Sequence, residues 1–156
     1  MRWSVAPTIT SLPELSAGEI PLTTENQTRA TTPYERLGGQ VVLRALVDRF
    51  YDLMEQDPAY AALRAMHAPD LAPMRDSLTG FLTGWSGGPR DWFGAGKCVM
   101  GAHRPLAITA ETTAQWLDAM GRAVDAVLGA RDPELAAALI DALRQMATAM
   151  GPRTPA

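Results

Sequence analysis

His103 and Trp116 are the two residues whose chemistry stands out in this sequence. His103 is one of only two histidines among the 156 residues. A neutral imidazole is a good ligand for a metal such as iron, and an indole N–H can only donate a hydrogen bond. Together they can hold a metal cofactor and address a ligand bound to it. Taken singly, each also has an ordinary interpretation, His103 as a surface residue and Trp116 as a core residue.

The composition indicates one globular domain. Hydrophobic residues make up 47% of the chain and the net charge is −3, which argues against a nucleic-acid partner. The single cysteine, Cys98, excludes an internal disulfide framework and fits a reducing cytoplasm. No apolar run is long enough to cross a membrane, and residues 1–11 lack the apolar core of a secretory signal. We therefore expect a cytoplasmic protein with no membrane partner.

The chain divides into three parts. Residues 1–32 contain Pro7, Pro13 and Pro21 and no sustained hydrophobic period, which predicts a poorly ordered extension. Residues 33–150 carry a helical pattern and form the expected domain. Residues 151–156 are a short C-terminal tail.

The hydrophobic periodicity predicts an all-α domain with four substantial helices. Glycine, proline and capping residues mark their ends. Residues 90–101 are glycine-rich and are expected to be irregular. The expected helical segments are a short turn over 34–37, then 42–56, a short piece ending at 66, 73–85, a long helix capped by Thr109 and ended by Gly129, and a last helix from Pro133 to Met150.

Several motifs occur in a fixed order along residues 33–150. They are Tyr34-Glu35-Arg36-Leu37-Gly38-Gly39, Phe50-Tyr51, Leu63-Arg64 before the corner at His67, Asp70-Leu71, Leu78-x-x-Phe81-Leu82-x-x-Trp85-x-Gly87-Gly88-Pro89, His103-x-Pro105-Leu106-x-Ile108 and Trp116-Leu117-x-x-Met120. In this order and spacing the chain resembles the truncated haemoglobins, specifically their second group. The resemblance implies a two-on-two helical sandwich around one haem b.

The resemblance also assigns roles to individual residues. His103 matches the proximal iron ligand, while Tyr51 and Trp116 match the distal residues that donate hydrogen bonds to a bound ligand. The apolar cofactor wall is expected from Leu78, Phe81, Leu82 and Ile108. The implied ligands are O2, NO, CO, peroxide and similar small molecules. Each of these residues also has a plain structural interpretation as part of a helical core.

Two distal positions depart from the family pattern. His67 stands where the group often has tyrosine or phenylalanine. It can donate to a bound ligand, titrate near neutral pH, or bind iron directly; as an ordinary turn residue it would face solvent. Met74 replaces a residue that is small in many members, and it is expected to narrow an entry path with a flexible side chain.

The segment before the proximal histidine departs further. Ala102 stands where the family has an arginine, which leaves the partners of the haem propionates open. Lys97 and Arg104 are the candidate substitutes, although each can equally be an ordinary solvated charge. Cys98 is expected to be a buried, inert thiol; a thiolate ligand lacks the motif support that His103 has.

These assignments lead to three functional hypotheses. The first is an oxygen-binding haem protein for nitric oxide, peroxide or oxygen redox chemistry, or for sensing, because three polar groups at about 1.5–3 kcal/mol each would slow ligand release too much for transport. For this first hypothesis we expect a reductase partner and a monomer or weak homodimer. The second is a six-coordinate electron-transfer protein with His67 or Tyr51 as the sixth ligand. The third is a haem-free helical interaction module.

Overall fold

The computed structural model describes residues 31–97, 103 and 106–151. Every regular element within these residues is helical, so the all-α prediction is confirmed. The extension over residues 1–32 falls almost wholly outside the described part and stays a prediction. The elements are α1 (Pro33–Leu37), α2 (Gly39–Gln56), the 3₁₀ turn η1 (Pro58–Tyr60), α3 (Ala61–Ala65), α4 (Ala72–Trp85), α5 (Asp91–Gly94), α7 (Ala110–Val124), the π turn η2 (Asp125–Gly129) and α8 (Pro133–Met150).

The helix ends follow from local capping. Thr32 and Thr109 each form a capping box at the start of α1 and α7, which satisfies backbone N–H groups that have no partner inside the helix. Asp132 caps α8 by accepting a hydrogen bond from the Leu135 N–H at 3.1 Å. Gly38 separates α1 from α2 with φ 106°, a left-handed conformation that favours glycine. The predicted corners therefore lie where the capping chemistry requires them.

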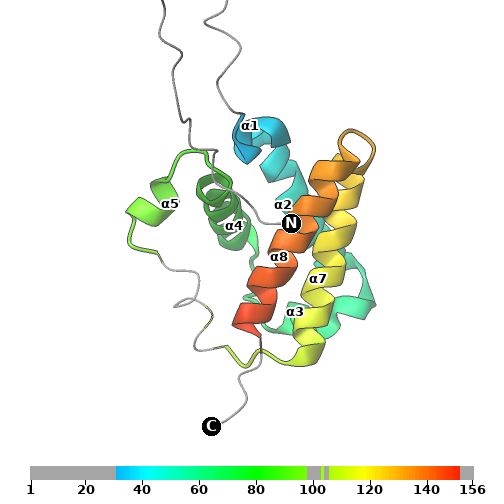
Figure 1. Ribbon diagram of the computed structural model, residues 1–156. Helices are drawn as coiled ribbons and strands as arrows, with labels where there is room; N and C mark the ends of the chain where they lie inside the picture. The colour runs from blue at the N-terminus through cyan, green and yellow to red at the C-terminus, as the bar shows by residue number, and fades with distance from the viewer. Residues whose placement is uncertain (1–30, 98–102, 104–105, 152–156) are drawn as a thin grey trace, which may run out of the picture.

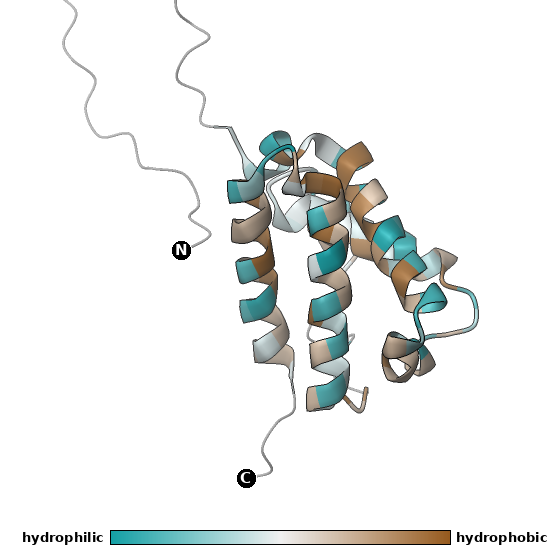
Figure 2. Ribbon diagram, turned by 90° about the vertical axis from the view of Figure 1, so that its right-hand side faces the viewer, coloured by the Kyte–Doolittle hydropathy of each residue, from teal (hydrophilic) through white to brown (hydrophobic). Residues whose placement is uncertain are grey.

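The four long helices form two packed pairs (Figure 1). Helix α2 packs on α4 and α7 packs on α8, while α2 also contacts α7 and joins the two pairs. Leu46, Phe50, Met120 and Val124 are among the fully buried side chains at this junction. Figure 2 shows hydrophobic and hydrophilic residues alternating along the helices, as expected for amphipathic helices around one core.

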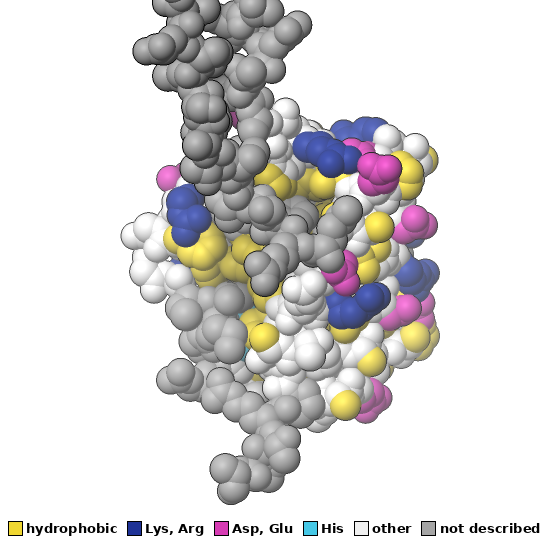
Figure 3. Space-filling model, viewed as in Figure 1, with side chains coloured by type: hydrophobic (Ala, Val, Ile, Leu, Met, Phe, Trp, Pro, Cys, Tyr) yellow, Lys and Arg dark blue, Asp and Glu magenta, His cyan; other side chains and the backbone are white. Residues whose placement is uncertain are grey.

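Ion pairs hold α4 against α2 from the outside. The Arg75 guanidinium on α4, whose side chain is only 17% exposed, lies 3.0 Å from Asp48 and 2.8 Å from Asp52, both on α2. Arg44 on α2 in turn reaches Asp76 on α4. On the face seen in Figure 3, acidic and basic side chains are interspersed rather than gathered by sign. In the described ranges no helix is long and apolar enough to cross a membrane.

Residues 91–94 correct the expectation of an irregular segment over residues 90–101. They form the short helix α5, which carries Trp92 and Phe93 onto α4. The Trp92 ring lies 5.3 Å and the Phe93 ring 5.7 Å from the ring of Phe81, centroid to centroid. The position of α5 could not be predicted from its own residues. Trp92 and Phe93 pack against Gly80 and Gly84, which lie on α4 and leave space for the two rings.

Gly84→Ala tests this close contact. A Cβ at Gly84 would lie 2.7 Å from the Phe93 ring, so we expect the free energy of unfolding to fall by about 1–3 kcal/mol despite the better helix propensity of alanine. Gly121→Ala is the matched control, because Gly121 is also helical and a Cβ there meets nothing within 4 Å. It should gain up to about 1 kcal/mol. Equal effects in urea denaturation would contradict the contact.

Candidate functional site

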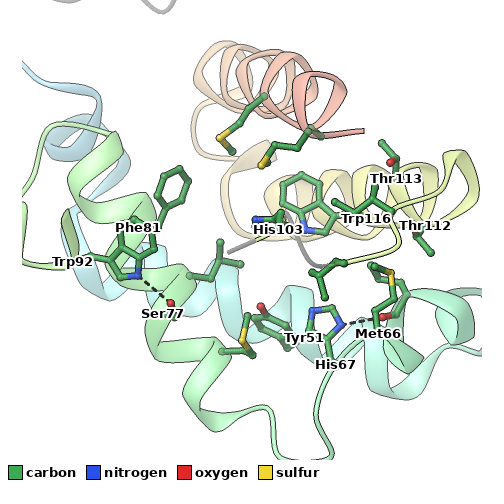
Figure 4. A pocket seen from close by; sticks show the side chains of 18 residues that line it. Tyr51, Met66, His67, Ser77, Phe81, Trp92, His103, Thr112, Thr113 and Trp116 are labelled. Carbon is green, nitrogen blue, oxygen red and sulfur yellow. Dashed lines mark hydrogen bonds between the residues drawn. The ribbon is translucent and has the colours of Figure 1, made fainter. Parts of the chain in front are cut away.

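One large cavity lies between the two helix pairs (Figure 4). It contains about 1010 Å³ of space, including its opening to solvent, and its walls are mostly apolar side chains with a few polar groups, as is usual for sites of small molecules and cofactors. The residues that line it are Tyr51, Leu63, Met66, His67, Met74, Ser77, Leu78, Phe81, Trp92, His103, Leu106, Ile108, Thr112, Thr113, Trp116, Met146, Ala147 and Met150.

The cavity brings together most of the residues singled out in the sequence. Those that line it are Tyr51, His67, Met74, Leu78, Phe81, His103, Ile108 and Trp116. Leu82 does not line it and instead is buried in the core. Lys97 is exposed and also lies outside the lining. Arg104, Cys98 and Ala102 lie outside the described residues.

Tyr51 and Trp116 offer two hydrogen-bond donors to this cavity. No hydrogen bond of the Tyr51 hydroxyl or of the Trp116 indole N–H occurs among the described residues, and both side chains line the cavity. Phe50 packs edge-on against both rings, at 4.9 Å from Tyr51 and 5.7 Å from Trp116. Buried tyrosine and tryptophan side chains usually find a partner for their polar atom. These two donors are therefore available to a ligand.

The Tyr51 hydroxyl is held in its protonated form. Burial raises its pKa to about 12, and the Arg75 guanidinium, 5.7 Å from the ring centroid, offsets only part of that effect. At neutral pH Tyr51 is therefore a neutral phenol, able to donate a hydrogen bond and poorly suited to bind a metal as phenolate.

His67 differs from the other two polar groups because its tautomer is fixed. Its Nδ1 lies 2.9 Å from the Leu63 carbonyl oxygen, and a carbonyl can only accept, so Nδ1 carries the proton. Burial, the largest cause, lowers the pKa of the imidazole and favours the neutral ring. The neutral ring then has an unprotonated Nε2. In this tautomer the one N–H of His67 is engaged by Leu63, so donation to a ligand would require this hydrogen bond to break, and the role of His67 toward a ligand stays a prediction.

The backbone that fixes His67 is itself anchored to the helix that carries Trp116. The Leu63 N–H donates to Gln115 Oε1 at 3.0 Å, and Gln115 precedes Trp116 on α7. A second link joins α7 to the segment before α3. The Arg122 guanidinium on α7 donates to the Tyr60 hydroxyl and to Asp57, at 2.9 Å each. Figure 4 shows Tyr51 and His67 side by side, with His103 and Trp116 facing them.

Some lining residues were not expected from the sequence. Met146 and Met150 lie one helical turn apart on α8. They do continue the buried face of α8, but at the cavity end of the helix. Trp92 reaches the cavity from α5, where its indole N–H donates to Ser77 Oγ at 2.9 Å. Only the docking of α5 on α4 brings these last two residues together, and no sequence spacing encodes it.

Comparison with known proteins shows which family this chain is similar to. The family model described as "Bacterial-like globin" matches residues 32–150. A comparison with curated protein sequences finds no match. The fold is similar to a cold-adapted truncated haemoglobin from Pseudoalteromonas haloplanktis TAC125, with 31% sequence identity over 80% of this chain and 100% of that one and a TM-score of 0.75.

Two further solved structures are similar. One is a group II 2-on-2 haemoglobin from Agrobacterium tumefaciens, with 28% identity, a TM-score of 0.76, and coverage of 82% of this chain and 99% of that one. The other is a thermostable haemoglobin from Thermobifida fusca, with 31% identity, a TM-score of 0.70, and coverage of 80% and 100%. The paired helices seen here match the 2-on-2 arrangement named for the Agrobacterium protein.

Gln115→Ala tests the link between the distal corner and α7. It removes the acceptor of the Leu63 N–H, so we expect a loss of about 1 kcal/mol of stability and faster hydrogen exchange at the Leu63 amide. Gln145→Ala is the matched control, because Gln145 donates to Asp141 as Gln115 donates to Glu111, and no hydrogen bond from a backbone N–H to Gln145 occurs among the described residues. If Gln115→Ala leaves exchange at Leu63 unchanged, the hydrogen bond does not hold this corner.

Proposed function

Because this chain belongs to the bacterial-like globins and is a truncated haemoglobin, we propose that it binds haem b through His103 and uses the cavity to bind O2 and other small ligands for redox chemistry or sensing. Haemoglobin relatives imply a haem cofactor. The single observation that carries the finer proposal is the pairing of an imidazole with two unpartnered donors, Tyr51 and Trp116, in one apolar cavity.

The residues of the cavity fit a flat, largely apolar cofactor that carries a metal. His103 supplies the imidazole, and Leu78, Phe81 and Ile108 supply apolar surface. Met74 adds apolar surface at the rim of the cavity, since it is 38% exposed. Haem iron held by one imidazole keeps a coordination position open for a small ligand. Among the described residues, Lys97 lies outside the cavity lining, so it gains no support here as a propionate partner.

The distal residues favour retention of a ligand over its rapid release. Tyr51 donates from its hydroxyl and Trp116 from its indole N–H to a ligand that carries partial negative charge. Such hydrogen bonds are stronger than neutral ones, at about 1.5–3 kcal/mol each, and every 1.4 kcal/mol changes an equilibrium about tenfold. Slow release suits nitric oxide or peroxide chemistry, with electrons from a reductase, better than bulk oxygen transport.

One observation supports the alternative of a six-coordinate electron-transfer protein. The unprotonated Nε2 of His67 belongs to a ring that lines the cavity, and a neutral imidazole nitrogen is a good iron ligand. Tyr51 is the weaker candidate, since its pKa of about 12 opposes the phenolate form. The absorption spectrum of the reduced protein separates the two functions: a high-spin spectrum supports open ligand binding, and a low-spin one abolished by His67→Ala supports the alternative.

Oxygen release from the ferrous protein tests the role of the two donors. Tyr51→Phe and Trp116→Phe each remove one donor and keep an aromatic ring, so each should raise the oxygen dissociation rate about tenfold or more. Trp92→Phe is the matched control, because that indole also lines the cavity but donates to Ser77. Stopped-flow rates that are unchanged in Tyr51→Phe and Trp116→Phe, or raised equally in all three variants, would contradict the proposal.

A further inference from the structure

Methionine is concentrated around the cavity. The chain has eight methionines, and four of them, the cavity methionines, line the cavity: Met66, Met74, Met146 and Met150. Met146 and Met150 belong to α8, whereas Met74 belongs to α4 and Met66 caps the end of α3. Their sulfur atoms accordingly lie on both sides of the cavity (Figure 4). The walls that face the cofactor therefore carry thioethers from both helix pairs.

Solvent exposure separates the cavity methionines from the core methionines. Met74 is 38% exposed, and the other three are partly buried at a cavity that opens to solvent. Met54 and Met120 are each only 1% exposed and belong to the hydrophobic core. A small solute that enters the cavity can thus reach the first group of side chains without any unfolding, and not the second.

The chemistry that a thioether offers to such a solute is oxidation. In a reaction with hydrogen peroxide, a sulfur lone pair attacks one peroxide oxygen, an S–O bond forms and the O–O bond breaks. The leaving hydroxide takes the proton of the transferred oxygen and becomes water. Sulfur loses two electrons and the peroxide gains them. The product, methionine sulfoxide, is polar and is returned to methionine by methionine sulfoxide reductases.

The cavity offers hydrogen bonds to a sulfoxide, and the core does not. A sulfoxide oxygen can only accept, and the Tyr51 hydroxyl and the Trp116 indole N–H line the same cavity. An oxygen added to Met54 or Met120 would instead be buried among hydrophobic side chains, where an unsatisfied polar group is costly. The folded protein can therefore accommodate the product at the cavity.

We propose that the cavity methionines are a site of reversible oxidation by peroxide, and that their oxidation speeds the release of a bound porphyrin. Sulfoxide oxygens replace part of the apolar surface that covers a flat cofactor, so the wall holds the cofactor less well. The oxidation itself is independent of the proposed function. Its effect on the porphyrin rests on that function, since it requires the cofactor to bind in this cavity.

Peptide mass spectrometry tests the oxidation. The ferric haem-loaded protein, and the same protein loaded with zinc protoporphyrin, which has no redox-active iron, are treated with hydrogen peroxide. In both, each cavity methionine should gain one oxygen at least about tenfold faster than Met54 and Met120. Methionine sulfoxide reductases should then remove the added oxygen. Met54 and Met120 are internal controls, so this test needs no variant that might fold poorly.

Transfer of fluorescent zinc protoporphyrin to an excess of apomyoglobin tests the consequence. Oxidation should speed the transfer about tenfold, and the reductases should restore the original rate. The double variant Met146→Leu, Met150→Leu keeps the wall apolar at similar volume, and peroxide should accelerate its transfer less than twofold to threefold. The double variant Met54→Leu, Met120→Leu is the matched control and should respond to peroxide as the unmodified protein does.

Two results would overturn the oxidation site. One is oxidation of Met74 alone, at the rim, with the other three as slow as Met54 and Met120. The other is sulfoxide formation only in the haem-loaded protein, which would show an oxidant made at the iron instead of direct transfer. An unchanged transfer rate after complete oxidation would overturn the effect on the porphyrin. A protein that takes up no porphyrin would refute the proposed function, while mass spectra of the same protein would still decide the oxidation site.

Discussion

The spacing of the helices around the cavity is the constraint on which the site depends. Contacts between neighbouring helices set this spacing at several points of the wall. Arg75 holds α4 to α2 through Asp48 and Asp52, and Gln115 holds the corner after α3 to α7. On the remaining side, Trp92 holds α5 to α4 through Ser77.

The same contacts between helices also affect the polar groups that line the cavity. Arg75 lies 5.7 Å from the Tyr51 ring centroid while it joins two helices, and the chain from Gln115 through Leu63 sets which nitrogen of His67 carries the proton. Phe50 packs edge-on against the rings of Tyr51 and Trp116 and so helps to position both side chains at the cavity. The hydrogen bonds that hold the cavity wall together are formed by Gln115, Leu63 and Ser77. The donors that face a ligand belong to other residues, Tyr51 and Trp116.

The sequence predicts this architecture well where local chemistry decides it. Thr109, Asp132 and the glycines at positions 38 and 39 mark helix ends through capping and φ, which depend on near neighbours. Contacts between distant segments are harder to predict from the sequence. The helix α5 and its docking on Gly80 and Gly84 need the tertiary fold. The acceptor role of His67 depends on a carbonyl four residues earlier, whose direction only the folded corner defines.

Replacing His103 with glycine tests the central claim most directly, because the account requires this imidazole to hold the haem iron. The purified variant should lose the axial spectroscopic signature of imidazole ligation, and added imidazole should restore it by binding in the space left by the side chain. A variant that retains the same tightly bound pigment and the same axial signature without added imidazole would contradict the account.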